Sequence, residues 1–291
     1  MNRLVVIDAH PVAYRAFYSP GTAHLKTSNG IASGVFYGVL NTFQALKKQL
    51  PKSAYLFCFD SFGSWRNAVY PHYKKRTQLS KPDGFIEQLD HVREFLIAAG
   101  VSVLRWSELE ADDLISLVVS AWNSRSPKST SVIVSSDRDF FQLVSKKTLC
   151  YDDRAKIFYG PEDVWNKIGV PPAYIVNYKC LLGDVADGIK GIRGYGKVKA
   201  ARYAQFVHPS DFLSEGDTAI FNLNHHLICL PRSMEYIPLD IVEQTALKED
   251  IRDTLEGLSC GNVRAANLER VQELLSIYEV RKFKIEDFIE R

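Results

Sequence analysis

Short apolar runs that each end near a carboxylate constrain the fold of this chain more than any other feature of its sequence. The runs are rich in β-branched and aromatic residues, which is typical of buried strands. They occupy residues 4–7, 55–59, 101–104 and 131–135. The acids that follow them are Asp8, Asp60, Glu110, Asp137 and Asp139. The sequence therefore predicts four strands, three of which lead directly into an acid.

Helical patterns lie between these predicted strands. Residues 34–50 and 85–99 carry apolar side chains at a spacing close to 3.6 residues, as in helices with one buried face. Because strands and helices alternate, we expect an α/β fold with a mostly parallel central sheet and helices on both faces. Ligands of such sheets bind beyond the carboxyl ends of the strands. The acids should therefore meet at one edge of the sheet.

The composition changes after about residue 159. Sequences that can start helices follow at residues 160–163 and 171–172, and residues 188–196 are rich in turn-forming residues. We place a boundary near residue 160, between a first unit (1–160) and a second unit (161–291). Since no repeat, low-complexity tract or long Ser/Gly linker separates them, we expect the two units to pack tightly.

Charge and cysteine content narrow the class of protein only slightly. The 36 basic and 34 acidic residues give a net charge of +2, so only the local arrangement of charge is informative. Five scattered cysteines indicate a reducing cytoplasm, because no close pair could start a zinc site or a disulfide framework. Asp8 interrupts any signal peptide, and no apolar stretch approaches the ~20 residues that span a bilayer. We expect a cytoplasmic protein that does not bind membranes.

Nine acids in five segments predict a metal centre. They are Asp8, Asp60, Glu110, Asp112, Asp113, Asp137, Asp139, Asp184 and Asp187. Asp137 and Asp139 would share one side of an extended segment, and Asp184 and Asp187 one face of a helix. Gathered carboxylates repel unless cations neutralise them, and oxygen-only ligands favour Mg²⁺ or Mn²⁺. Two such ions ~4 Å apart would suit phosphoryl transfer.

Each acidic segment, taken alone, also has a structural explanation. Strand-end aspartates commonly cap the next helix, and the acids at 110–113 could complement a helix N-terminus. Asp184 and Asp187 could be solvated loop acids. Because five independent explanations are improbable together, the sequence favours a shared metal centre.

Two stretches without acids, residues 61–82 and 188–210, directly follow Asp60 and Asp187. Cations interleaved with aromatic residues suit contact with nucleic-acid phosphates and bases, whereas the plain alternative is a solvated basic face. Residues 188–197 also have the glycine spacing of a helix-hairpin-helix turn, in which backbone N–H groups approach a phosphate closely. Their position beside the acids favours binding of a nucleic-acid backbone.

In order and spacing these residues resemble the 5′-nuclease family, which includes flap endonucleases, bacteriophage 5′-exonucleases and the N-terminal nuclease domain of bacterial DNA polymerase I. The match runs from residue 4 to about residue 203. The motifs that carry it are Val6-Ile7-Asp8 with Arg15, Phe59-Asp60 with Trp65-Arg66 and Pro71-His72-Tyr73-Lys74, Glu110-Ala111-Asp112-Asp113, Ser136-Asp137-Arg138-Asp139-Phe140, and Gly183-Asp184-Val185-Ala186-Asp187-Gly188-Ile189.

The resemblance implies a PIN-like core, a helical arch at about residues 62–92 and a helix–three-turn–helix module that binds duplex DNA at about 176–206. The first of two metal ions would be surrounded by Asp8, Asp60, Glu110 and Asp112, with help from Asp113. The second would be surrounded by Asp137, Asp139, Asp184 and Asp187.

The resemblance also implies roles for basic residues and glycines. Contacts to the phosphate beside the cut would come from Lys74, Arg15 and either Arg66 or Arg76. Lys74-Lys75-Arg76 departs from the family pattern, which has two residues between the lysine and the arginine. Further DNA-binding residues would be Tyr73, Lys75, Lys190, Gly191, Gly194, Gly196, Lys197 and Lys199. A K⁺ ion can lie at the hairpin.

We therefore expect a structure-specific 5′-nuclease, both flap endonuclease and 5′–3′ exonuclease, that leaves 5′-phosphate and 3′-hydroxyl ends. Expected partners are branched, flap or duplex DNA with 5′ ends, RNA–DNA hybrids and a DNA polymerase acting in trans, in a bacterial or phage-infected cell. Two alternatives stay open. A Toprim-like nuclease would explain Asp137 and Asp139 but not Asp60, Asp184 and Asp187. A catalytically silent protein would use the arch and hairpin only to recognise DNA junctions.

Overall fold

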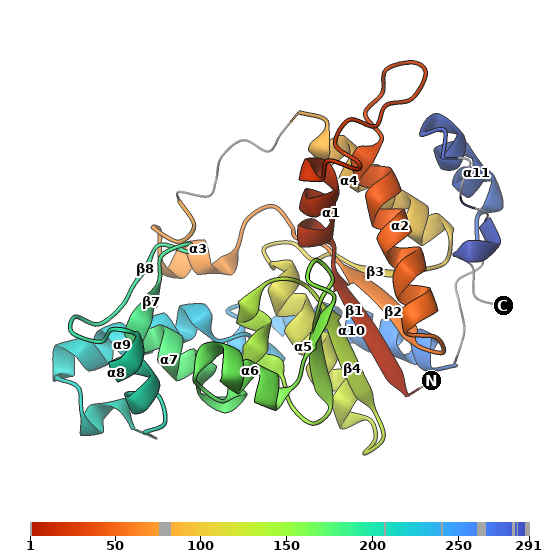
Figure 1. Ribbon diagram of the computed structural model, residues 1–291. Helices are drawn as coiled ribbons and strands as arrows, with labels where there is room; N and C mark the ends of the chain where they lie inside the picture. The colour runs from red at the N-terminus through yellow and green to blue at the C-terminus, as the bar shows by residue number, and fades with distance from the viewer. Residues whose placement is uncertain are drawn as a thin grey trace.

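The computed structural model describes residues 2–75, 83–206, 208–239, 241–260, 266–280, 283 and 285–288. At its centre is a six-stranded sheet in the order β3-β2-β1-β4-β5-β6 (Figure 1). The strands are β1 (Arg3–Asp8), β2 (Ala54–Cys58), β3 (Ser102–Leu104), β4 (Thr130–Val134), β5 (Thr148–Asp152) and β6 (Ile157–Tyr159). The first five are parallel and β6 pairs antiparallel with β5. The predicted α/β class and mostly parallel sheet are confirmed.

Alternate side chains of β1 point to opposite faces of the sheet and so contribute to two hydrophobic cores. Val5 and Ile7 belong to one core and Leu4 and Val6 to the other. Helices that pack into the first core are α1 (Ala9–Tyr18), α2 (Gly34–Gln49), α4 (Phe85–Ala98) and α11 (Leu268–Ile277). Helices that pack into the second are α5 (Ala111–Ser124) and α10 (Ile241–Cys260). Burial on both faces explains why β1 is apolar without interruption.

The segment after residue 160 forms a group of short elements beside the sheet (Figure 1). They are α6 (Pro161–Ile168), α7 (Ile175–Leu182), β7 (Gly183–Asp184), β8 (Ile189–Lys190), α8 (Lys197–Tyr203) and α9 (Glu215–Ile228). Leu181, Ile192 and Phe221 form a third hydrophobic cluster there, which also contains Tyr73 from the first part of the chain. Since α10 contacts β2 and α5, and α11 packs on α4, the chain beyond residue 160 also completes the cores of the first part.

Several short elements connect these layers. The short helix α3 (Trp65–Val69) follows β2. The 3-10 helices are Arg138–Leu143, Pro172–Tyr174, Pro209–Asp211, Met234–Tyr236 and Ile285–Asp287. The predicted arch at about residues 62–92 is described only at its two ends, by α3 and the start of α4. Residues 76–82, and therefore Arg76, lie outside the described residues.

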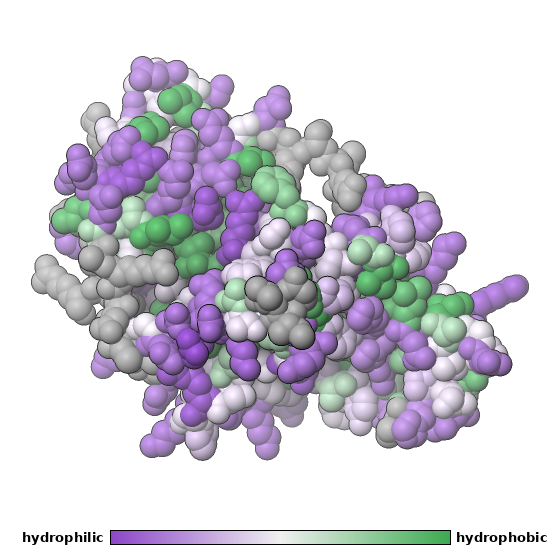
Figure 2. Space-filling model, turned by 180° about the vertical axis from the view of Figure 1, so that it is seen from behind, coloured by the Kyte–Doolittle hydropathy of each residue, from purple (hydrophilic) through white to green (hydrophobic). Residues whose placement is uncertain are grey.

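Seen from behind, the surface is mostly hydrophilic, and its hydrophobic side chains gather in separate patches (Figure 2). Scattered apolar surface of this kind is normal for a folded domain. Within the described ranges, no helix combines the length and the apolar character needed to cross a membrane.

Candidate active site

The strand order places a first group of acids at one edge of the sheet. Because β1 lies between β2 and β4, Asp8 at the end of β1 is flanked by Asp60 after β2 and Asp137 after β4. Asp112 joins them from the first turn of α5. Burial raises the pKa of Asp8 well above its usual value, and the charges of Asp60 and Asp137 raise it further.

The same causes act on Asp112, whose pKa is raised well above its usual value by burial and then by the charges of Asp8 and Asp137. These carboxylates are therefore close enough to repel one another. A cation between them would remove the repulsion, which is the behaviour expected of a metal site. Asp8, Asp60, Asp112 and Glu110 are brought together here as expected for the first ion, whereas Asp137, which was expected at the second, joins them.

Hydrogen bonds orient two of these carboxylates. The hydroxyl of Ser135 donates to Asp8 Oδ2 at 3.0 Å. The backbone N–H of Ala111, at the start of α5, donates to Asp60 Oδ1 at 2.8 Å. His10 Nδ1 lies 3.3 Å from Asp60 Oδ2. Because the N-terminus of a helix stabilises a negative charge, α5 both presents acids to this edge and holds Asp60 in place.

Asp137 and Asp139 do not lie in an extended segment, so the predicted geometry of this pair is wrong. β4 ends at Val134, and a 3-10 helix begins at Arg138. Asp137 caps that helix by accepting a hydrogen bond from the backbone N–H of Asp139 at 2.8 Å. The turn leaves Asp137 with the first group of acids and places Asp139 in a second group. The pair therefore links the two groups.

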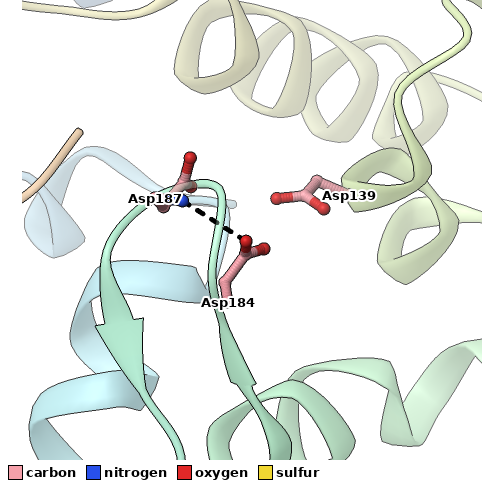
Figure 3. Close-up of side chains that lie close together, drawn as sticks. All are labelled: Asp139, Asp184 and Asp187. Atoms are coloured by element: carbon pink, nitrogen blue, oxygen red, sulfur yellow. Dashed lines mark hydrogen bonds between the residues drawn. The ribbon is translucent and has the colours of Figure 1, made fainter. Parts of the chain in front are cut away.

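The second group consists of Asp139, Asp184 and Asp187. One carboxylate oxygen from each lies within 4.8 Å of those of the other two (Figure 3). Burial raises the pKa of Asp187 to about 6; the charge of Lys74 opposes this rise, and the charges of Asp184 and Asp139 add to it. Three oxygen ligands at this spacing fit a hard divalent cation.

Asp184 and Asp187 do not share a helix face, which was the predicted reason for their proximity. Helix α7 ends at Leu182, and Gly183 has a φ of +83°. Asp184 accepts hydrogen bonds from the backbone N–H groups of Ala186 and Asp187 at 3.0 and 3.4 Å. A tight turn, rather than a helix, therefore brings the two acids together.

A lysine that the sequence did not single out lies among these acids. Lys179 Nζ is 2.6 Å from Asp184 Oδ2 and forms a second ion pair with Asp139. Lys179 is on α7, five positions before Asp184 in the sequence. No sequence signal identified it, because one lysine on a helix is most often exposed.

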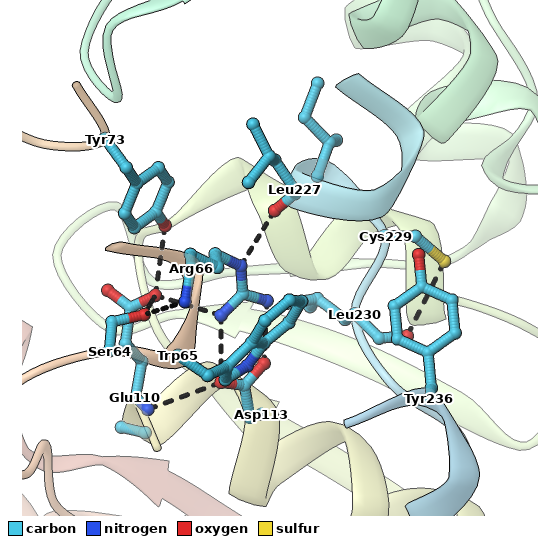
Figure 4. A network of polar contacts seen from close by, with 12 residues as sticks. Ser64, Trp65, Arg66, Tyr73, Glu110, Asp113, Leu227, Cys229, Leu230 and Tyr236 are labelled. Atoms are coloured by element: carbon cyan, nitrogen blue, oxygen red, sulfur yellow. Dashed lines mark hydrogen bonds and ion pairs between the residues drawn. The ribbon is translucent and has the colours of Figure 1, made fainter. Parts of the chain in front are cut away.

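Arg66 and Asp113 form a buried ion pair instead of facing the site (Figure 4). Their side chains are 2% and 0% exposed. Arg66 donates to Asp113 at 2.7 and 2.9 Å and to the backbone carbonyl of Leu227 at 2.8 Å. Trp65 Nε1 also donates to Asp113, at 3.1 Å. Arg66 therefore stabilises the fold beside the site and does not make the predicted phosphate contact. Asp113 is buried against Arg66 and has no direct access to a metal.

Tyr73 is buried as well and does not offer its ring to DNA as predicted. Its hydroxyl donates to Glu110 Oε2 at 3.0 Å, and Arg66 donates to the same oxygen at 3.0 Å. Lys74 Nζ lies 2.5 Å from Glu110 Oε1. Burial alone would raise the pKa of Glu110, but the charges of Lys74 and Arg66 lower it below its usual value. Glu110 is thus an ionised acid that contacts both the buried Arg66 and Tyr73 and the site residue Lys74.

Lys74 connects the two groups of acids. Its side chain pairs with Glu110, and its backbone N–H donates to the carbonyl of Asp187 at 2.9 Å. Its backbone has a φ of +50°, a conformation that residues other than glycine rarely adopt. Burial alone would lower the pKa of Lys74, but the charge of Glu110 raises it, so the ammonium is charged at neutral pH. Strain at a cation beside the acids is a feature of functional positions.

The other predicted phosphate contacts lie elsewhere. Arg15, on α1, forms an ion pair with Asp153 and donates to Thr42 Oγ1 at 2.8 Å. It does not line the cleft described below. Lys75 is exposed beside Lys74.

A cleft of about 770 Å³ joins the two groups of acids. Its acidic lining is Asp112, Asp137, Asp139, Asp184 and Asp187, and its basic lining includes Lys74, Lys167, Lys179 and Lys197. A cleft lined by both acids and cations fits divalent metal ions and a phosphate ester in the same space.

The glycine-rich hairpin, residues 188–196, lies in the segment that connects α7 to α8. Gly191 permits close contact, because a Cβ there would meet the carbonyl oxygen of Leu182 at 2.2 Å. Gly194 has a φ of +86°, which favours glycine. The side chains of Lys190, Lys197 and Lys199 are exposed, and Lys199 Nζ lies 4.0 Å from the centre of the Tyr195 ring. Gly196 is also exposed, one residue before α8 begins. This surface presents cations to solvent.

An exposed aromatic residue beside the first group of acids is a second feature that the sequence did not single out. Phe62, two positions after Asp60, is 76% exposed. The guanidinium carbon of Arg105 lies 5.1 Å from the centre of its ring. Arg105 follows β3, so the tertiary fold brings this pair together.

Comparisons with known proteins agree with this arrangement. Residues 3–169 match the family model described as 5′-3′ exonuclease, N-terminal resolvase-like domain. A 5′-3′ exonuclease from Aquifex aeolicus is 31% identical over 197 residues, which cover 67% of this chain and 66% of that protein. DNA polymerase I from Caldicellulosiruptor bescii is 31% identical over 210 residues, which cover 69% of this chain and 24% of the polymerase. The chain thus spans about a quarter of the length of such polymerases.

Solved structures show the same fold. The bacteriophage T5 flap endonuclease, in a complex with DNA and metal ions, superposes with a TM-score of 0.69 at 18% identity, over 88% of this chain and 99% of that chain. Flap endonuclease-1 from Methanococcus jannaschii superposes with a TM-score of 0.52 at 12% identity, over 89% and 93% of the two chains.

Proposed function

The chain belongs to the 5′-3′ exonuclease family defined by the N-terminal resolvase-like domain, and from this membership we propose that it is a divalent-metal-dependent 5′-nuclease. It hydrolyses DNA phosphodiester bonds near 5′ ends, as flap endonuclease and 5′–3′ exonuclease, and leaves 5′-phosphate and 3′-hydroxyl ends. The observation that carries this proposal is the cleft in which both groups of acids and Lys74 meet.

The donor set supports two bound ions. Asp8, Asp60, Asp112 and Glu110 would hold the first, and Asp139, Asp184 and Asp187 the second, with Asp137 between them. The all-oxygen ligands favour Mg²⁺ or Mn²⁺. Bound ions would supply the positive charge that activates water and stabilises the leaving oxygen in phosphoryl transfer.

Lys74 would act on the phosphate itself. Its ammonium lines the cleft and is already held beside Glu110 at 2.5 Å. A donor fixed in this way can bond to a non-bridging oxygen of the phosphate as negative charge develops there, without a costly rearrangement. Arg15 lies outside this cleft, so any phosphate contact that it makes would be to a more distant part of the strand.

The hairpin would hold the double-stranded part of the substrate. The structurally similar T5 flap endonuclease was solved in a complex with DNA and metal ions. Here the exposed lysines and the backbone N–H groups around Gly191 and Gly196 suit a regularly spaced phosphate track. A K⁺ ion at the hairpin, RNA–DNA hybrids as substrates and a DNA polymerase acting in trans are part of this proposal. So is a cytoplasmic location, which suits the free thiols of Cys58, Cys150, Cys180 and Cys229.

A single assay tests the proposed function. A DNA flap labelled at its 5′ end and a nicked duplex are incubated with the protein in Mg²⁺ and in EDTA, and product lengths are scored. We expect cleavage only with the metal, and cleavage by Asp112→Asn that is slower by orders of magnitude. Tight junction binding without metal-dependent cleavage would refute the proposal and support a DNA-binding protein without nuclease activity.

A further inference from the structure

The ammonium group of Lys179 is bonded to two of the three acids in the second group. It lies 2.6 Å from Asp184 and pairs with Asp139, and both acids belong to the second group. Its side chain is only 16% exposed. Two of the three carboxylates in this group are therefore already bonded to a positive charge that belongs to the chain itself.

The backbone of Lys179 cannot carry the ammonium far from the acids. Its neighbours Cys180 and Leu181 are fully buried in the third hydrophobic cluster, which fixes this turn of α7. The side chain also lines the cleft. A Lys179 side chain that left the acids would therefore still lie beside the cleft.

An ammonium and a divalent ion cannot both satisfy these carboxylates. Mg²⁺ requires oxygen ligands at about 2.1 Å in near-octahedral geometry, and Mn²⁺ prefers the same kind of ligand. The oxygens that would provide them are the ones that accept hydrogen bonds from Lys179. Like charges at this separation would also repel strongly. Occupation of the second group by an ion therefore requires Lys179 to leave.

We propose that Lys179 is a built-in counter-ion for the second group of acids, which holds Asp139 and Asp184 together without metal and competes with a divalent ion for them. The inference rests on the proposed function, because it assumes that these acids bind metal. It assigns Lys179 to control of metal loading: the second ion binds more weakly than the acids alone would allow. A DNA phosphate in the cleft would offer the displaced ammonium a new partner.

The test measures metal binding directly, without an activity assay. Free Mn²⁺ is followed by electron paramagnetic resonance while it is titrated into the wild type, Lys179→Met and Lys167→Met. Lys167 is the matched control, because it lines the same cleft but donates to the hydroxyl of Tyr159 at 2.7 Å. We expect the weaker of two Mn²⁺ sites to tighten by about tenfold or more in Lys179→Met, since two charged hydrogen bonds no longer oppose binding. Lys167→Met should change it much less.

Two other results of the Mn²⁺ titration would overturn the inference. Equal tightening in both variants would overturn the inference, because it would show only a general effect of charge in the cleft. Unchanged or weaker binding in Lys179→Met would also overturn it, and weaker binding would indicate that Lys179 assembles the ligands. If Lys179→Met folds only with metal, equilibrium dialysis of the Mn²⁺-loaded protein provides the same comparison.

The two proposals fail differently. If the wild type binds no Mn²⁺ at all, the metal-dependent function fails. If the wild type binds two ions and Lys179→Met binds them with the same affinities, the function stands and only the role of Lys179 falls.

Discussion

Replacement of Arg66 by methionine should destabilise the protein by about 3–5 kcal/mol, because it leaves the negative charge of Asp113 buried without a cation beside it. Asp113 is 0% exposed, and Arg66 makes two hydrogen bonds to it, one to Glu110 and one to the carbonyl of Leu227. A loss of this size is a large share of the about 5–15 kcal/mol that stabilise a typical domain.

A second substitution separates the buried charge from the lost contacts. Asp113→Asn removes the charge. Its amide oxygen can still accept a hydrogen bond from Trp65 Nε1, which lies 3.1 Å from the carboxylate in the wild type. Arg66→Met/Asp113→Asn should therefore be more stable than Arg66→Met alone, a non-additive result expected of contacting residues.

The assay is urea unfolding followed by tryptophan fluorescence, with DNA binding measured in parallel. Arg125→Met is the control, because Arg125 donates to the carbonyl of Leu255 and its guanidinium lies over Trp122. Loss of that single hydrogen bond should cost only about 1 kcal/mol. If Arg66→Met kept its stability but bound DNA more weakly, Arg66 would be a phosphate ligand after all and its role in stabilising the fold would be wrong.

Four further predictions follow from the site. Asp112→Asn should lower the cleavage rate by orders of magnitude in Mg²⁺ while DNA binding survives or tightens, and a variant that cleaves at the wild-type rate would remove Asp112 from the metal ligands. Lys74→Ala should reduce single-turnover rate more than affinity, since its charge helps most in the transition state; the opposite pattern would make it a DNA anchor. The pKa of Asp187 is raised to about 6 in the folded protein, so its contribution to metal-free stability is present below about pH 4 and is lost as pH rises towards 6. Unfolding measured across that range should show a smaller loss of stability in Asp187→Asn than in the wild type, because Asp8 and Asp112, whose pKa values are also raised, still contribute to it. Equal slopes in the two proteins would contradict the assignment. Lys197→Ala/Lys199→Ala should weaken binding of duplex-containing flaps and flatten the log–log salt dependence by about one per lost phosphate contact, whereas equal losses on single strands would indicate general electrostatic attraction.

The sheet could be predicted from the sequence because β1, β2 and β4 carry a local signal. Their runs are apolar on both faces, and parallel strands buried on both faces require such runs. β5 and β6 were not predicted, since Thr148–Asp152 alternates weakly and Ile157–Tyr159 is only three residues long. Pairing with β4 stabilises β5, and this tertiary contribution is invisible in a short sequence window.

The sequence predicted which acids form the site, but not the local geometry that brings some of them together. The acids at strand ends gather as expected because β2, β1 and β4 are parallel neighbours, so that their carboxyl ends lie at one edge of the sheet. Spacing alone could not show that Asp184 and Asp187 meet across a tight turn, since the same i, i+3 spacing occurs in helices and turns. Nor could it show that Arg66 is buried, because that depends on Leu227, 161 positions away. The role of Lys179 has the same origin in tertiary structure.

The contribution of α10 and α11 to the two hydrophobic cores has a consequence for synthesis on the ribosome. When residue 160 has been made, all six strands exist, but Leu247 and Ile251 of one core and Val271 and Leu274 of the other have not yet been made. Neither face of the sheet is then fully covered. The nascent chain should therefore stay sensitive to proteases and dependent on chaperones until its last helices emerge, and translation arrested after residue 239 should leave it in that state.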